Sequence, residues 1–272
     1  MPAISIITPV FNAARWLPET IASVQNQLFA DWEHIFADDG STDGSIDLIG
    51  NASREDPRIR LVRVSQNGGP AKARNRAIAV AQGRYLAFID ADDLWLPHKL
   101  SRSISWMNDK SYPFIYHDYR HISHDGSKVG ALVVGPSTLT PRTLHTRRGT
   151  GVLSVVIDRQ KIPGFHFPEA ERSLPEDFLA WLWVLRKGYI GHRLPEDLGR
   201  YRLSDRSRSS KKTIAAKAVW DLYRKYSRLS LPQCALFWSQ YAWRAYWLHL
   251  HARPNIETRN SPTALIRDAA TY

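Results

Sequence analysis

Short apolar runs of strand length alternate with helix-like stretches through the first 110 residues of the chain. Leu17, Ile21 and Val24 recur at the spacing of one helix face. Pro70 and Pro97 each stand where a later helical stretch would begin. Strands that alternate with helices need crossover connections, which place the strands parallel in one sheet. The sequence therefore predicts an α/β fold with a mainly parallel sheet. The strand-like runs lie near residues 3–8, 33–37, 59–64 and 85–89.

Carboxylates follow directly on two of these strand-like runs. Asp90-Ala91-Asp92-Asp93 comes after residues 85–89, and Asp38-Asp39 comes after residues 33–37. Three carboxylates within four residues repel one another, but Mg²⁺ or Mn²⁺ takes one or two such ligands together with substrate phosphates. The carboxyl ends of parallel strands meet at the sheet edge where open α/β sheets bind ligands. A phosphate-bearing nucleotide with its metal is therefore the first hypothesis.

Each acidic cluster also has a purely structural interpretation. Asp38-Asp39 followed by Gly40-Ser41 suits a polar turn with a helix cap, and Asp90 to Asp93 suits a cap before Pro97. Glu176-Asp177 stands at the start of another predicted helix, where carboxylates are ordinary. The residues alone leave these alternatives open.

The alternating pattern changes after about residue 112. Apolar runs at 114–116 and 129–134 flank His124-Asp125-Gly126-Ser127, which predicts a hairpin turn. We expect a mixed sheet in this part of the chain. The ten histidines form no HExxH or similar ligand pair, so no zinc site is predicted. Further strands are expected near 152–157, 189–194 and 198–203, and a helix from Pro175 to about Lys187.

The net charge of +11 is concentrated in the last quarter of the chain. Residues 200–272 hold 14 Lys and Arg against 4 Asp and Glu, whereas the other residues hold 23 against 22. Helices expected at about 211–228 and 232–251 interleave these cations with aromatic residues. Such helices suit an anionic membrane surface, although the aromatic face equally suits packing on the rest of the protein or a dimer contact. Nucleic acid is not expected as a partner, because binding to nucleic acid would leave the acidic clusters without a role.

Cysteine content and hydropathy indicate the compartment. The single cysteine, Cys234, excludes a disulfide framework and fits a reducing cytoplasm. No basic segment precedes an apolar stretch after Met1, and no run of 18 apolar residues occurs. We therefore expect a cytoplasmic protein.

A series of motifs, taken in order, resembles glycosyltransferase family 2 with the GT-A fold. The resemblance covers residues 1–205 and implies a Rossmann-like, mainly parallel sheet with a nucleotide-sugar-binding half at 1–111 and a mixed acceptor-side half at 112–205. A basic aromatic helical tail at 206–252 and an irregular C-terminus at 253–272 would follow. The motifs are Thr8 to Asn12, Asp38 to Asp43, Asn67 to Asn75, Phe88 to Asp93, and Glu176-Asp177 with Lys187-Gly188-Tyr189.

The resemblance also implies roles for individual residues. Asp177 would be the base that deprotonates the acceptor, with Glu176 beside it as the alternative. If Asp177 caps its helix, the helix dipole would hold it ionised. Arg202 or Arg206 would pair with the diphosphate, unless they belong to a solvated basic loop. The expected nucleotide and donor ligands are Pro9, Phe11, Asp38, Asp39, Arg74, Asn75 and Asp90, and the expected metal ligands are Asp92, Asp90 and Asp93.

The family transfers a sugar from a nucleotide-sugar to an acceptor hydroxyl, usually with inversion, while Mn²⁺ or Mg²⁺ neutralises the leaving diphosphate. The resemblance therefore implies an inverting, hexosyl-type transferase that acts on a glycan or lipid-linked acceptor. It would build bacterial surface polysaccharide or lipopolysaccharide, as a peripheral protein at the inner face of the plasma membrane. One alternative is a sugar nucleotidyltransferase, which would carry a Gly-rich basic loop where Val10 to Ala14 stands. The other is a non-catalytic sugar- or nucleotide-binding module.

Overall fold

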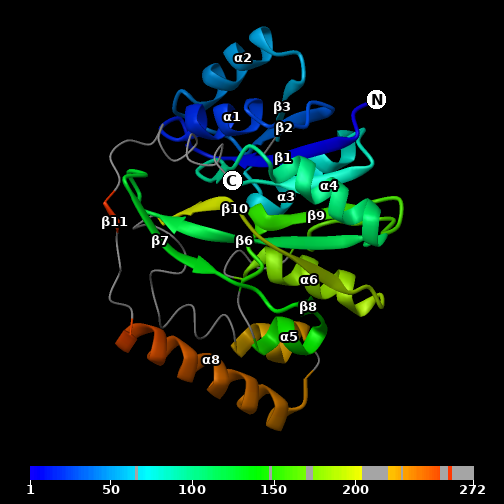
Figure 1. Cartoon of the computed structure of the whole chain (residues 1–272), viewed down its shortest axis with the longest axis vertical. Coiled ribbons are helices and arrows are strands. Elements are labelled where there is room, and N and C mark those ends of the chain that lie inside the picture. The colour runs from blue at the N-terminus through cyan, green and yellow to red at the C-terminus, as the bar shows by residue number, and fades with distance from the viewer. Residues whose placement is uncertain are drawn as a thin grey trace.

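A computed structural model describes residues 1–64, 67–146, 149–169, 174–203, 220–227, 229–251 and 257–258. Its centre is a mixed sheet whose main path runs β11-β7-β6-β9-β4-β1-β2-β3 (Figure 1). The first strands pair side by side and all run parallel, which confirms the predicted parallel sheet. These strands are β1 (Ile4–Val10), β2 (Trp32–Asp38), β3 (Ile59–Arg63) and β4 (Tyr85–Phe88).

Helices cover both faces of this sheet because successive strand residues point to opposite sides. Ile4 and Ile6 of β1 belong to a buried cluster with α1 (Leu17–Gln25), α2 (Ser45–Glu55) and α4 (Lys99–Lys110). Ile7 belongs instead to the cluster on the other face, with α3 (Pro70–Val80) and α6 (Glu176–Arg186). Pro residues stand in the first turns of α1 and α3, where the missing N–H costs nothing.

The second half of the chain extends the same sheet with antiparallel and parallel pairs. The predicted hairpin is formed by β6 and β7, and β9 lies antiparallel between β4 and β6. β10 runs parallel to β6. The division expected between residues 111 and 112 falls between α4 and β6. The strands of this half are β5 (Leu94–Trp95), β6 (Phe114–Ile122), β7 (Lys128–Val133), β8 (Thr138–Leu139), β9 (Val155–Asp158), β10 (Gly191–Arg202) and β11 (Glu257–Thr258).

Two local predictions differ from the structure. The strand expected at 152–157 begins as a 3₁₀ turn, η1 (Val152–Ser154), which the Ser154 N–H closes on the Gly151 carbonyl at 3.0 Å. The two strands expected at 189–194 and 198–203 are one strand, β10, whose register with β6 shifts between Leu194 and Gly199. Pro195 lies in this irregular stretch, since proline has no N–H for the ladder.

The C-terminal region folds against the second half (Figure 1). α8 (Leu231–His251) confirms the helix predicted at 232–251. The helix predicted at 211–228 is described only from residue 220, where η3 (Leu222–Tyr226) is π-helical. Both lie beside α5 (Pro141–Thr146) and α6 (Figure 1). The predicted loop at 204–210 and most of the predicted irregular terminus lie outside the described residues. None of the helices in the described ranges is long and apolar enough to cross a bilayer.

Candidate active site

The two acidic segments meet at one edge of the sheet. β1 lies between β2 and β4 and runs parallel to both, so the chain leaves β2 at Asp38 and β4 before Asp90 on the same side. The Asp39 N–H continues this pairing by donating to the Val10 carbonyl at 2.8 Å. The structure therefore brings the acidic segments together at the carboxyl edge of the sheet, as the parallel topology predicted.

The Asp38-Asp39 pair organises the loops around this edge. The buried Asp38 carboxylate accepts the Gly40 N–H at 3.1 Å, which is the polar turn that the sequence offered as an alternative. The Asp39 carboxylate accepts the N–H groups of Gly68 and Gly69 at 2.9 and 2.7 Å. Gly69 has φ 88°, a left-handed value that favours glycine before α3 begins. Asp39 therefore fixes the 67–69 loop.

Pro9 and Phe11 lie at the same end of β1. Pro9 is half-buried and pairs in register with Ala37 of β2. Phe11 follows the strand and is one of the exposed large apolar side chains of the described region. An exposed ring beside the Asp39 loop is available for stacking on a planar ligand.

Arg202 holds the second acidic segment in place. Its backbone N–H donates to Asp93 Oδ1 at 2.9 Å, and its Nε donates to the Asp92 carbonyl at 2.8 Å. Its two terminal nitrogens donate to the His124 carbonyl at 3.2 Å and to Glu19 at 2.7 Å. The side chain is only 1% exposed. Arg202 is therefore not part of a solvated loop, and its guanidinium supports the acidic segment, whereas its expected pairing with a diphosphate stays a prediction.

The three carboxylates of this segment lie in different surroundings. Asp90 pairs with Arg74, and Asp93 is buried with one oxygen that has no hydrogen-bond partner among the described residues. Burial, followed by the charges of Asp92 and Asp90, raises the pKa of Asp93 well above its usual range. The described side chains include no group of three or more His, Cys, Asp or Glu that could hold a metal. The metal-ligand roles expected of Asp90, Asp92 and Asp93 therefore stay predictions, and the pairing of Asp90 and the burial of Asp93 set these two apart from Asp92.

Asp92 fits the donor set of a divalent cation. Its side chain is half-buried, and burial followed by the charge of Asp90 raises its pKa to about 6. A cation beside Asp92 would relieve this excess of negative charge. One carboxylate with substrate phosphates is a common donor set for Mg²⁺, and carboxylates also suit Mn²⁺, so the residue present fits such an ion.

Arg74 joins the acidic segment at 90–93 to the second half of the chain. Its guanidinium lies 2.5 Å from Asp90 and 3.1 Å from Glu176, and it stacks 5.0 Å from the Phe167 ring. The neighbouring Asn75 side chain exchanges two hydrogen bonds of 2.8 Å with the Phe167 backbone. Asn75 therefore holds the 167 segment, and its expected role as a nucleotide or donor ligand stays a prediction.

Asp177 lies in the first turn of α6, beside Glu176. Pro175 occupies the N-cap position, so Asp177 does not cap the helix. Burial, followed by the charge of Glu176, raises the pKa of Asp177 to about 6, although Arg74 and the Phe178 N–H at 2.7 Å oppose this rise. The helix-dipole argument applied to a capping Asp177, and this condition is not met because Pro175 is the N-cap. A carboxylate with a pKa near 6 suits a general base at neutral pH. The Glu176 carboxylate is instead paired with the Arg74 guanidinium.

Tyr201 and Glu19 are site residues that the sequence did not single out in these roles. Burial, and then the charges of Asp93, Asp90, Asp92 and Asp177, raise the pKa of Tyr201. These four carboxylates therefore all lie close enough to Tyr201 to act on its pKa. Glu19 is 183 positions from Arg202 along the chain, and no local pattern signals their pairing.

The sequence also matches the profile of a known enzyme family. The profile of Glycosyl transferase family 2 matches residues 5–155. The chain belongs to glycosyl transferase family 2. This membership favours a transferase over the sugar nucleotidyltransferase that the sequence left open.

Family-2 relatives cover most of the chain. The putative teichuronic acid biosynthesis glycosyltransferase TuaG of Bacillus subtilis (strain 168) is 36% identical over 241 residues, which span 89% of this chain and 95% of TuaG. The UDP-Glc:alpha-D-GlcNAc-diphosphoundecaprenol beta-1,3-glucosyltransferase WfgD of Escherichia coli is 36% identical over 220 residues, or 80% of this chain and 84% of WfgD.

Solved structures show the GT-A fold for this family-2 chain. S. aureus TarS in complex with UDP-GlcNAc matches 93% of this chain and 76% of its own, with a TM-score of 0.67 and 18% identity. The mannosyltransferase PcManGT of Pyrobaculum calidifontis, in complex with GDP-Man and Mn²⁺, matches 99% of this chain and 79% of its own, with a TM-score of 0.63 and 17% identity.

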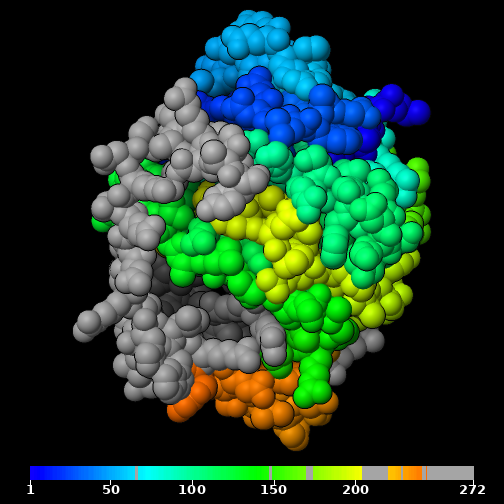
Figure 2. All heavy atoms as spheres, in the orientation of Figure 1, coloured from blue at the N-terminus to red at the C-terminus, as the bar shows by residue number. Residues whose placement is uncertain are grey.

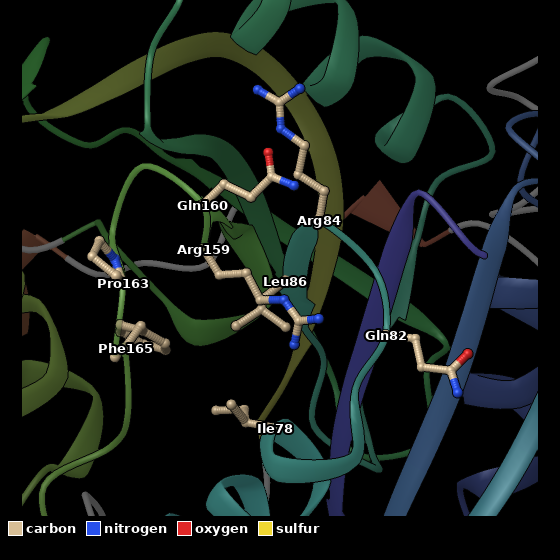
Figure 3. Close-up of a pocket in the computed structure, with 9 residues that line it drawn as sticks. Ile78, Gln82, Arg84, Leu86, Arg159, Gln160, Pro163 and Phe165 are labelled. Carbon is tan, nitrogen blue, oxygen red and sulfur yellow. The ribbon is translucent and has the colours of Figure 1, made fainter.

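A cavity of about 400 Å³ lies away from the acidic edge of this family-2 domain (Figure 3). Arg84 and Leu86, at the start of β4, line it together with Ile78 near the end of α3. Asp90 follows the opposite end of β4, so the cavity and the acidic segments lie at opposite edges of the sheet. Arg84 is held by Asp158 at 2.6 Å. The candidate active site is therefore the acidic edge.

Proposed function

We propose that this protein is a metal-dependent, inverting glycosyltransferase that moves a hexosyl-type sugar from a nucleoside-diphosphate sugar to an acceptor hydroxyl. The observation that carries the proposal is the bridge made by Arg74 between Asp90 and Glu176. The bridge holds the donor-side acids and Asp177 in one site, as a direct transfer requires. The donor would bind on the side of residues 1–111, and the acceptor on the side of residues 112–205.

The proposed reaction is a single displacement with Asp177 as its base. The acceptor oxygen bonds to the anomeric carbon as the bond from that carbon to the diphosphate oxygen breaks, which inverts the configuration. The acceptor proton passes to a carboxylate oxygen of Asp177, whose pKa of about 6 leaves it ionised at neutral pH. Mn²⁺ or Mg²⁺ held by Asp92 and the donor phosphates would supply positive charge for the leaving diphosphate.

The nucleotide would bind beside the 67–69 loop. Phe11 offers an exposed ring for stacking, next to Pro9 and the turn at Asp38. The Asp39 carboxylate already accepts two glycine N–H groups. A carboxylate has about four acceptor positions, so it can also accept an N–H of a base such as uracil. The name of WfgD contains UDP-Glc, which favours a uridine nucleotide as the donor carrier.

The acceptor is proposed to be a lipid-linked glycan at the inner face of the bacterial plasma membrane. The name of WfgD contains a diphosphoundecaprenol acceptor, and the name of TuaG places it in teichuronic acid biosynthesis. The C-terminal tail would hold the enzyme at that surface as a peripheral protein. Leu231, Leu236 and Trp243 of α8 are each more than half exposed, and Arg224 and Lys225 of η3 are exposed as well. Trp and basic side chains are favoured at anionic membrane surfaces.

Calorimetry of nucleotide binding tests the donor site. UDP, GDP and UDP-glucose are titrated into the wild-type protein and into Asp92→Asn, with and without Mn²⁺. We expect a uridine nucleotide to bind wild type only with Mn²⁺, and the affinity of Asp92→Asn to fall by at least about tenfold. Equal binding with and without metal would refute the metal-dependent assignment, and binding of GDP alone would refute the uridine assignment.

A further inference from the structure

The tail packs directly on the helix that carries the proposed base. Leu222 and Tyr223 of η3 and Cys234 of α8 are buried in one cluster with Leu174 and Leu179, which flank the first turn of α6. Figure 2 shows α8 at one end of the molecule, next to the segment around α5. The inner face of α8 is therefore covered by the rest of the protein. The structure shows the packing that the sequence offered as an alternative, and the outer face stays exposed.

A polar network lies inside this apolar contact, with His145 of α5 at its centre. The Nδ1 of His145 faces the Pro141 carbonyl, and its Nε2 lies 2.8 Å from Ser227 Oγ. The Tyr223 hydroxyl donates to the His145 carbonyl at 2.9 Å. Burial lowers the pKa of His145, so a neutral ring donates from Nδ1 to Pro141 and accepts from Ser227 at Nε2. These bonds specify one arrangement of the tail on α5.

The same imidazole reaches the first turn of α6 through its ring. Its centroid lies 5.3 Å from that of Phe178, 5.4 Å from that of Tyr223 and 5.7 Å from that of Phe237 on α8. Phe178 directly follows Asp177 and donates its N–H to the Asp177 carboxylate at 2.7 Å. The chain of contacts therefore runs from the tail through His145 and Phe178 to Asp177.

We propose that the docked tail is a positioning element for the base, and that His145 and Ser227 are the positioning residues that connect it to Asp177. The N-cap residue of α6, Pro175, makes no side-chain capping hydrogen bond, so packing acts together with the Arg74–Glu176 ion pair to place the first turn. A polar network with satisfied partners fixes one geometry where apolar contacts alone would permit sliding. This inference rests on the proposed role of Asp177 as the base.

A matched pair of serine variants tests the proposal in the full-length protein. Ser227→Ala removes the hydroxyl that bonds His145, whereas Ser239→Ala removes one that donates to the Leu236 carbonyl on the exposed side of α8. Hydrogen exchange is measured at the amides of residues 178–180, and kcat and donor KM are measured for transfer. We expect Ser227→Ala to accelerate the exchange about fivefold and to lower kcat about tenfold, with donor KM within about twofold of wild type.

Exchange and turnover in these variants decide whether the tail positions Asp177. Restoration of exchange and kcat by Ser227→Thr, which keeps the hydroxyl, together with wild-type behaviour of Ser239→Ala, would support positioning. Equal exchange and turnover in Ser227→Ala and Ser239→Ala would overturn it. A loss of donor affinity in parallel with kcat would also overturn it, because that pattern indicates general destabilisation. If wild type transfers no sugar, the proposed function fails, and the exchange data still decide whether the tail orders α6.

Discussion

Replacing Arg74 by glutamine should weaken the protein and change the pH dependence of transfer at the same time. Arg74 is 2% exposed, and its guanidinium is the partner of both Asp90 and Glu176. The glutamine side chain would keep much of the volume but leave two carboxylates without their cation. The change therefore removes the charge that joins the donor side of the site to the side of the base.

The size of the effect follows from the exposure of the partners. Breaking a buried ion pair by removing one member costs about 3–5 kcal/mol. Asp90 is 32% exposed and Glu176 13%, so water screens part of the remaining repulsion and the lower end applies. We expect a loss of about 3 kcal/mol in the free energy of unfolding and a fall of about 10 °C in melting temperature. Urea unfolding followed by tryptophan fluorescence measures this loss.

The pH dependence of transfer should shift to higher pH in Arg74→Gln. A base works when it is ionised, so transfer by wild type should decline as the pH falls through about 6, the pKa of Asp177. The positive charge of Arg74 lowers that pKa, so its removal should move the acid limb of the rate profile to higher pH. Arg76 is exposed on the same helix, and Arg76→Gln is the matched control. The reasoning is refuted if Arg74→Gln unfolds within about 1 kcal/mol of the control and keeps the wild-type acid limb.

Other changes separate the remaining roles. Asp177→Asn should bind donor with wild-type affinity in calorimetry but lower kcat by about 10³-fold, and near-normal kcat would show that Asp177 is not the base. Arg202→Gln should lower the free energy of unfolding by about 2–3 kcal/mol in urea, because it removes the bonds to Glu19 and to the Asp92 carbonyl. Leu236→Ser should reduce sedimentation with phosphatidylglycerol vesicles about tenfold, whereas Ile190→Ser, at another exposed apolar side chain, should not. If Leu236→Ser instead dissociates a dimer without affecting vesicle binding, the outer face of α8 is a contact between subunits.

Much of the donor side could be predicted from short stretches of sequence. Alternating apolar runs and proline-initiated helices define β1 to β4 and their helices, and the parallel order then brings Asp38 and Asp90 to one edge. The roles within the acidic segment were harder to predict. Asp90, Asp92 and Asp93 are neighbours in sequence but differ in their surroundings. Asp90 pairs with Arg74, Asp92 is half-buried, and Asp93 is buried and accepts the Arg202 backbone N–H. Sequence proximity shows none of these differences in surroundings, which arise from packing with distant segments.

The sequence by itself determined the fold class, the family and the edge at which the acids gather, because these depend on local periodicity and on motifs a few residues long. The tertiary structure decided which acids are buried, how Arg74 and Arg202 are paired, and where α8 packs. Arg74 meets Glu176 across 102 positions, and Ser227 meets His145 across 82. The pKa of Asp177 is raised chiefly by burial. Such pairings and burial arise only when distant segments pack together and exclude water, and no local pattern encodes them.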